Sequence, residues 1–380
     1  MPSRRRFLHA AVVAAGMGVL RRADAGNDDP VRRDAYAIDG EGGVAMLIAP
    51  VDAPQDEAQI AQELAAVRAS GLSACLLTVG NSGGGYWYTD AAYEASQATL
   101  RLCLERVRTR PTHFMQIDNG GDLQRARQQR RLGVIPRFQG AEPLGADTGR
   151  IAIFRRLGLR VVQLTHNQRN LVGDGCLEPG NAGLSNFGRR VVEALNAEKL
   201  VVDLAHASQR TTAEAIRASK APVLISHTGC RALADLPRNT GDAELRAMAE
   251  RGGVAGIIFW PYLRLDAQPL ASDVVRHIEH AIQVCGEDHV GIGTDGPIAP
   301  FERTPQFERE HRALIADIVA GGYFGPGRGH QTLYLFVPDL NRADRFQVLA
   351  ALLAARGHTQ RRIDKILGGN FARVMGEVWS

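Results

Sequence analysis

Short apolar runs alternate with longer amphipathic segments along most of the chain. Runs rich in Val, Ile and Leu have the length of buried strands and cover residues 35–39, 74–79, 133–138, 160–164, 200–204, 222–226, 254–259 and 289–293. Helical patterns lie between most of them, at residues 56–70, 91–108, 148–157, 186–197, 211–219, 243–251 and 271–285. This alternation is typical of repeated strand–helix units around a parallel sheet.

The number of strand–helix units predicts a closed α/β barrel of the (β/α)8 type, and an open doubly wound sheet is the alternative. Residues 113–117 can form one additional strand. After Asp295 the chain reads as loop-rich until helical patterning returns at Asp344. We therefore expect one barrel domain over residues 26–380, with extra loops and C-terminal helices.

The first 25 residues have a different pattern. Arg4, Arg5 and Arg6 open a basic segment, residues 8–20 are mildly apolar, and Ala23 and Ala25 supply small residues at the positions that define a cleavage site. This resembles a twin-arginine export signal. An N-terminal anchor is the alternative, but the apolar run is too short to span a bilayer. We expect cleavage after Ala25 and a periplasmic or otherwise exported protein.

Composition and charge exclude several classes of partner. The formal net charge is +4, and residues 1–25 hold five Arg and one Asp, so the remainder is nearly neutral. No basic stripe with interleaved aromatic residues is present, which argues against nucleic acid. Residues 26–380 contain no apolar run long enough for a membrane span. The five cysteines lack C-x-x-C spacing and do not suggest a disulfide framework. The sequence is compatible with a homodimer and does not fix the oligomeric state.

Polar residues stand where the predicted strands end, which is where barrel enzymes place their chemistry. These residues are Glu41, Gln139, His166, His206, His227 and Asp295. A single histidine at such a position is more often structural than a ligand, but three histidines at one end of a barrel predict a metal or acid–base cluster. Asp203, three residues before His206, is a candidate to orient an imidazole.

Several ordered motifs resemble those of a known family. They are residues 164–167 (LTHN), 183–189 (GLSNFGR), 202–208 (VDLAHAS), 225–228 (ISHT), 237–239 (PRN) and 291–296 (GIGTDG). Together they resemble the membrane (renal) dipeptidases, a family of zinc peptidases with an amidohydrolase-like barrel. The likeness runs from about Ile135 to Gly296, and residues 367–379 are also similar.

The resemblance implies a dipeptide-cleaving barrel with two zinc ions bridged by a glutamate and a hydroxide. His206 and His227 would hold one ion together with the bridging group. His166 would contact the substrate and steady the developing oxyanion, Arg238 would bind the substrate carboxylate, and Asp295 would move a proton. Zinc supports such chemistry because it lowers the pKa of bound water and polarises a carbonyl.

The sequence departs from the family pattern at the first zinc position. Glu41 stands where the family has a ligand histidine, Gly43 where it has a ligand aspartate, and Gln139 where it has the bridging glutamate. Glutamine is neutral and cannot offset two nearby dications. Glu41 can still ligate a metal, whereas glycine offers no ligand. Glu142 is a weaker substitute for the bridge, three residues further along.

Two hypotheses follow. In the first, the chain is an exported metallodipeptidase with a reduced site: one zinc ion on His206 and His227, with Gln139, Glu41 or water completing the ligand shell. In the second, it is a non-hydrolytic homologue on the same barrel. That homologue would be a peptide-binding or maturation protein, or a metal-independent acid–base catalyst using His166 and Asp295. The joint presence of the five remaining family residues favours the first hypothesis.

Overall fold

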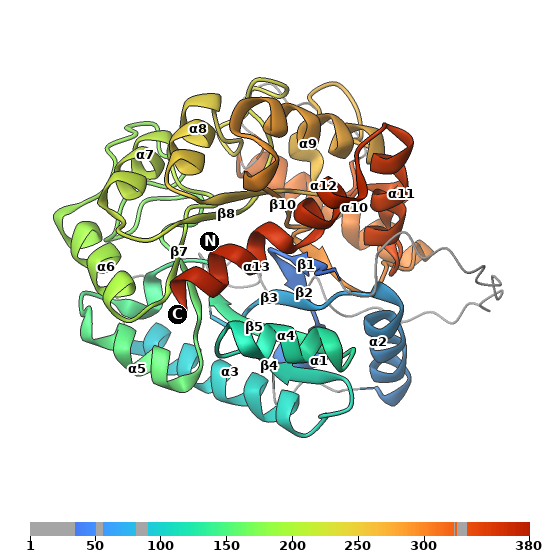
Figure 1. Cartoon of the computed structure of the whole chain (residues 1–380), viewed down its shortest axis with the longest axis horizontal. Coiled ribbons are helices and arrows are strands. Elements are labelled where there is room, and N and C mark those ends of the chain that lie inside the picture. Colours follow the sequence, from blue (N-terminus) through green and yellow to red (C-terminus); the bar gives the residue numbers. More distant parts are fainter. Residues whose placement is uncertain (1–34, 51–55, 81–89, 323, 325–332) are drawn as a thin grey trace.

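Parallel strands close into a barrel, with helices outside it (Figure 1). The computed structural model describes residues 35–50, 56–80, 90–322, 324 and 333–380. The predicted export segment, residues 1–25, lies outside the described residues. The barrel strands are β1 (Ile38–Asp39), β3 (Ala74–Thr78), β5 (Leu132–Phe138), β6 (Val161–Gln163), β7 (Val201–Asp203), β8 (Leu224–Thr228), β9 (Val254–Ile257) and β10 (Val290–Ile292). Their neighbours run in the order β3-β1-β10-β9-β8-β7-β6-β5, and β3 pairs with β5 to close the ring.

The predicted fold class is confirmed, and each predicted strand region overlaps one barrel strand, with β5 starting one residue earlier and β8 ending two residues later than expected. The additional strand expected near residues 113–117 is also present as β4 (Phe114–Gln116), which pairs with β5 outside the closed ring. Every strand pair in the barrel is parallel. Parallel pairing places all the carboxyl ends of the strands at one end of the barrel.

The predicted helices are present within about two residues of their expected bounds. They are α2 (Glu57–Ser70), α3 (Asp90–Arg108), α5 (Gly149–Leu157), α6 (Asn186–Ala197), α7 (Gln209–Ala218), α8 (Asp242–Glu250) and α9 (Ala271–Cys285). Local capping explains several starts: the Ser185 hydroxyl accepts the Gly188 N–H before α6, and the Ser208 hydroxyl accepts the Thr211 N–H before α7.

Several elements were not expected from the sequence. They are α1 (Ala45–Ile48), α4 (Gly120–Gln128), α10 (Pro305–Ala320), the short 3-10 helices η1 (Glu142–Leu144), η2 (Pro261–Leu263), η3 (Glu287–His289) and η4 (Pro338–Leu340), and the parallel pair β2 (Gly42–Gly43) and β11 (Gly296–Pro297). Helix α10 shows that the loop-rich expectation after Asp295 was wrong for this stretch. Thr304 caps it by accepting the Phe307 N–H, and Pro305 fills its first position, where a proline loses no hydrogen bond.

Three helices end the chain, and the last of them closes the amino end of the barrel. They are α11 (Arg345–Ala355), which packs beside α2 and α9, α12 (Gln360–Leu367) and α13 (Gly369–Val378). Helix α13 lies across the strands in Figure 1, where Phe371, Val374 and Met375 join one apolar cluster with the interior residues of the strands. Those interior residues are Ile38, Ala74, Leu76, Ile135, Val161, Val201, Leu224 and Val254. Apolar side chains therefore fill the amino end of the barrel interior, and polar side chains occupy its carboxyl end. No described helix combines the length and apolar character needed to cross a bilayer.

Candidate metal centre and active site

Two histidines and an aspartate converge at the carboxyl ends of β7, β8 and β10, with His227 inside the last residues of β8 and the other two residues beyond their strands. His206, His227 and Asp295 each offer a ligand atom, and these atoms all lie within 4.8 Å of one another. The two imidazole Nε2 atoms are 3.0 Å apart. Asp295 Oδ2 lies 3.9 Å from His227 Nε2. The structure therefore brings together three of the residues that the sequence singled out. His206, His227 and Asp295 are called the three-residue cluster below.

The backbone is strained at two of these three residues. His206 has φ +62° and Asp295 has φ +55°, in the left-handed region that side chains other than glycine seldom adopt. The His206 carbonyl accepts the Cys176 N–H at 2.7 Å. The Asp295 N–H donates to the Glu41 carbonyl at 2.8 Å, and the Asp295 carbonyl accepts the Trp260 indole N–H at 2.5 Å. Such strain persists only where the surroundings enforce it, and it is common at functional sites.

Hydrogen bonds at Nδ1 set the tautomer of both imidazoles. His206 Nδ1 lies 2.7 Å from the Asn167 amide oxygen, an acceptor, so Nδ1 carries the proton. His227 Nδ1 lies 2.8 Å from the Ser226 hydroxyl. That hydroxyl donates its own proton to Asp203 Oδ2 at 2.6 Å, so it accepts from His227. Asp203 thus orients the His227 ring indirectly, because it fixes the direction of the Ser226 hydroxyl. In both rings the lone pair is therefore on Nε2, and the Nε2 lone pair of His227 also faces the Gln139 amide nitrogen at 3.5 Å.

The two Nε2 lone pairs face each other and fit a cation. Burial lowers the pKa of His206 and of His227 well below the usual value, and the Arg238 guanidinium adds to this, so both rings are neutral at pH 7. Two neutral acceptors 3.0 Å apart repel unless a positive charge lies beside them. Ligands of a tetrahedral zinc ion at about 2.0 Å lie about 3.3 Å apart.

Asp295 supplies the negative charge that would complete this site. Burial raises the pKa of Asp295 to about 6, opposed by the Arg238 and Arg137 guanidiniums, so the group is a carboxylate at neutral pH. Two imidazoles and one carboxylate are a common ligand set for a catalytic zinc ion, with a fourth position open to water. The residues present fit one divalent ion.

The other two proposed ligands lie differently. Gln139 is beside the three-residue cluster, with its Nε2 atom 3.5 Å from His227 Nε2. Glu41 does not join the cluster, because Thr78 donates to its Oε1 atom at 2.9 Å and Arg137 forms an ion pair with its Oε2 atom. Burial raises the pKa of Glu41, while the adjacent Arg137 guanidinium opposes this rise and favours the charged carboxylate. Glu142 is directed elsewhere, its Oε1 atom accepting from Asn170 at 3.1 Å.

The residues around Glu41 do not fit a second metal ion. Gly43 has no side chain, and its backbone pairs with Pro297 in the short β2–β11 pair. Asp39 accepts from the Thr294 N–H at 2.8 Å and the Thr294 hydroxyl at 2.6 Å. Gln139 is neutral, so no carboxylate is left to bridge two dications. We therefore assign no chemistry to an ion at this position.

His166 and Arg238 flank the three-residue cluster. The His166 ring stacks on that of His206 at a centroid distance of 4.1 Å, and burial lowers its pKa to about 3, so it is neutral. Arg238 is buried and donates through Nη2 to the His227 carbonyl at 2.9 Å. Its Nε and Nη1 atoms have no hydrogen-bond partner among the described residues. Two buried donors on a guanidinium suit a ligand carboxylate.

Sequence reasoning missed Arg137, Asn167 and Ser226, which hold the site together. Arg137 alone left a signal, since it is a charged residue within an otherwise apolar strand, β5. Asn167 and Ser226 were quoted only as parts of motifs. Their roles depend on contacts between neighbouring strands, which the sequence does not display.

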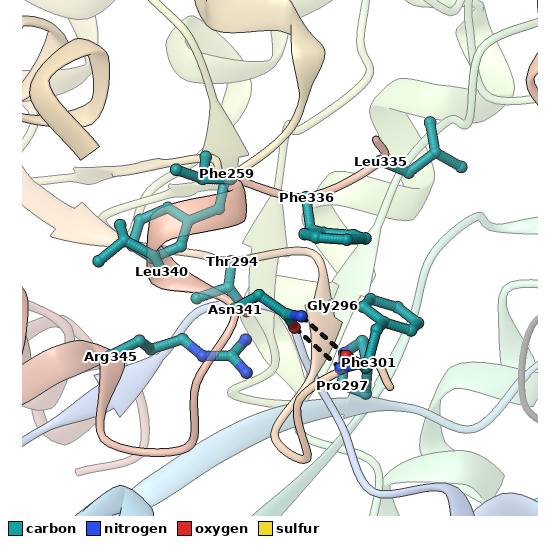
Figure 2. A pocket seen from close by; sticks show the side chains of 11 residues that line it. Phe259, Thr294, Gly296, Pro297, Phe301, Leu335, Phe336, Leu340, Asn341 and Arg345 are labelled. Carbon is teal, nitrogen blue, oxygen red and sulfur yellow. Dashed lines mark hydrogen bonds between the residues drawn. The ribbon is translucent and has the colours of Figure 1, made fainter. Parts of the chain in front are cut away.

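A small cavity lies beside the loop that carries Asp295 (Figure 2). Its volume is about 10 Å³, enough for about one water molecule and too small for a dipeptide. Thr294 and Arg345 line it, and Asn341 makes the two dashed hydrogen bonds to the Phe301 backbone, each of 2.8 Å. The cavity therefore belongs to the support of the Asp295 loop and is not a substrate site.

Comparisons with known proteins identify the family of the chain and agree with its fold. The sequence profile of the membrane dipeptidases, peptidase family M19, matches residues 28–300. A dipeptidase of Claviceps purpurea is 28% identical over 261 residues, which is 68% of this chain and 53% of that protein, so the chain spans about half of its length. An uncharacterised protein of Klebsiella pneumoniae, encoded in the 5' region of pqqA, is 28% identical over 298 residues, covering 75% of this chain and 91% of that one.

A solved structure shows the same barrel. It is an amidohydrolase from Pseudomonas aeruginosa that is 27% identical, with a TM-score of 0.73, and the match covers 91% of this chain and 97% of that one.

Proposed function

The chain belongs to the membrane dipeptidase family, peptidase family M19, and on this premise we propose that it hydrolyses dipeptides with the help of one divalent metal ion, zinc. The observation that carries the proposal is the pair of Nε2 lone pairs on His206 and His227, 3.0 Å apart with Asp295 beside them. When bound, a divalent ion there would polarise the substrate carbonyl and lower the pKa of a coordinated water.

Arg238 is the proposed anchor for the substrate. Its Nε and Nη1 donors, which have no hydrogen-bond partner within the described part of the chain, would take the C-terminal carboxylate of a dipeptide. Arg238 also bonds the His227 carbonyl, so this anchor is fixed relative to the metal ligands. A carboxylate held there would place the peptide bond near the three-residue cluster, which is the positioning that a two-residue substrate needs.

Asp295 and His166 are the proposed proton-handling groups. Asp295 presents two oxygens: one can complete the His206–His227 ligand set, and the other accepts a proton from the attacking water. The same carboxyl group then passes that proton to the leaving amine as the C–N bond breaks. His166, neutral and stacked on His206, donates an N–H to the oxygen on which negative charge develops.

A panel of dipeptides with and without a chelator tests this function. Zinc-loaded protein should release free amino acids from at least one dipeptide of the panel, including members with a D-residue at the C-terminal position. A chelator should remove the activity, and added Zn²⁺ should restore it. Peptide binding without turnover in the zinc-loaded protein would support the alternative, a non-hydrolytic binding or maturation protein.

We also propose that residues 1–25 direct export by the twin-arginine route. The basic start, the apolar residues 8–20 and the small residues Ala23 and Ala25 support this. Mass spectrometry of protein from the periplasmic fraction of a bacterial host should show a chain that begins at Gly26. Replacing Arg4 and Arg5 with Lys should leave the full-length chain in the cytoplasm. A chain exported despite that replacement would argue against the twin-arginine route.

A further inference from the structure

Arg137 places a guanidinium inside the barrel, where the metal site has lost its first-strand ligands. The side chain is fully buried. Its partners come from the end of β1 and from strands β6, β7 and β8, and they are Gly40, Glu41, Gln163, Asp203 and Ser226. Nη2 donates to Gln163 at 2.6 Å and lies 2.8 Å from Asp203 Oδ2, while Nη1 donates to the Ser226 hydroxyl at 3.0 Å.

This guanidinium is the counter-charge for two buried carboxylates. It forms ion pairs with Glu41 and with Asp203, and both side chains are nearly inaccessible to water. An arginine stays protonated in proteins, so its charge is permanent. A buried carboxylate without such a partner would be strongly destabilised. In the family pattern, the residue at the position of Glu41 contacts a metal ion; here its carboxylate contacts Arg137.

We infer that the Arg137 guanidinium replaces the metal ion that the family holds at the first zinc position, as a fixed positive charge that compensates Glu41 and excludes a divalent ion from this half of the site. The inference goes beyond the proposed hydrolysis but rests on the same family assignment. Two observations support exclusion. Both Glu41 carboxylate oxygens already accept from donors, Oε1 from Thr78 and Oε2 from Arg137. A dication beside the guanidinium would also be repelled by a like charge in a medium of low dielectric constant.

Arg137 is also a positioning residue for the half of the site that remains. Its Nη1 atom donates to the Ser226 hydroxyl, which accepts from His227 Nδ1. Asp203, which Arg137 pairs with, accepts the proton of the same hydroxyl. The guanidinium thereby helps to keep the lone pair of His227 Nε2 directed at the retained metal position.

Zinc counts of two matched variants test the exclusion. The first variant restores the family ligands while keeping the arginine: Glu41→His, Gly43→Asp and Gln139→Glu. The second adds Arg137→Gly to these three changes. A Cβ at residue 43 would lie 3.2 Å from Pro297 Cα, a tight contact that both variants share, so it cancels in the comparison.

The inference predicts that the first variant, which keeps Arg137, binds as much zinc as the natural chain. The second variant, with Arg137→Gly added, should bind one more zinc ion per chain than the first. An extra zinc ion in the first variant, with Arg137 in place, would overturn the inference. A folded second variant that binds no extra zinc ion would also overturn it. Both predictions concern changes in zinc count, from the natural chain to the first variant and from the first variant to the second. The test is therefore independent of whether the histidine half holds an ion and whether the protein is a hydrolase.

A second measurement uses single substitutions, in case the second variant, with its four changes, does not fold. In Arg137→Gly, Glu41 and Asp203 lose their counter-charge, so Zn²⁺ added beyond the amount that saturates the natural chain should raise the melting temperature. In Arg137→Lys, which keeps a positive charge, the same excess should have no effect. An equal rise in both variants, or a rise in neither, would contradict the exclusion.

Discussion

Replacing His206 with alanine is expected to remove the bound zinc and to lower kcat/KM for dipeptides by at least about 10³-fold, a loss of about 4 kcal/mol in transition-state stabilisation. His206 supplies one of the two imidazoles whose Nε2 atoms face each other. With one imidazole and one carboxylate left, the site no longer has the three protein ligands typical of catalytic zinc. Zinc content by atomic spectroscopy and steady-state kinetics measure the two effects on the same sample.

His280→Ala is the matched control for this loss. His280 lies on α9, where its Nε2 atom bonds Asp242 Oδ1 at 2.9 Å, away from the three-residue cluster. Its loss should leave zinc content and kcat/KM unchanged. Asn167→Ala should fall between the two, with zinc affinity reduced by about 10- to 100-fold, because Asn167 only orients the ring of His206. Full zinc content and activity in His206→Ala would exclude the histidine pair as the metal site.

Replacing Arg238 with methionine is expected to lower kcat/KM by about 10²-fold for dipeptides with a free C-terminal carboxylate. Methionine keeps much of the buried volume but removes the donors at Nε and Nη1, which have no partner among the described residues. Dipeptide amides lack the carboxylate, so the natural chain should cleave them slowly, and Arg238→Met should slow their cleavage little further. Kinetics on matched acid and amide substrates measure the difference.

Arg231→Met controls for the loss of a positive charge near the site. Arg231 lies in the same connection after β8 and pairs with Asp235 at 2.7 Å, with both side chains partly or largely exposed. Removing this charge should leave kcat/KM unchanged for both the acid and the amide substrates. If Arg238→Met lowered acid and amide substrates by the same factor, Arg238 would be supporting the His227 backbone and would not be binding a carboxylate.

The barrel could be predicted from the sequence because its strands are short apolar runs separated by long amphipathic helices. The elements that were missed carry weaker patterns. The pair β2–β11 consists of two residues per strand, too few for any periodicity, and its register exists only because the barrel brings Gly42 and Gly296 together. Helix α10 did have a local signal, Thr304 followed by Pro305, in a region that otherwise reads as loop.

The site could be predicted only as far as single residues mark it. His206, His227 and Asp295 stand after separate strands, and barrel geometry alone brings such positions together. The place of Glu41 could not be predicted, because its neighbours in space are remote in the sequence. Arg137, 96 residues away, turns the Glu41 carboxylate from a candidate ligand into half of an ion pair. This ion pair forms only because the closed barrel brings the ends of β1 and β5 near each other.

The zinc content of the purified natural chain, measured after loading with excess Zn²⁺ and removal of unbound metal, tests the reduced metal site most directly. One ion per chain, lost in His206→Ala and retained in His280→Ala, is the predicted result. Two ions per chain would contradict the role given to Arg137, and a chain that binds no zinc would contradict the metal site itself.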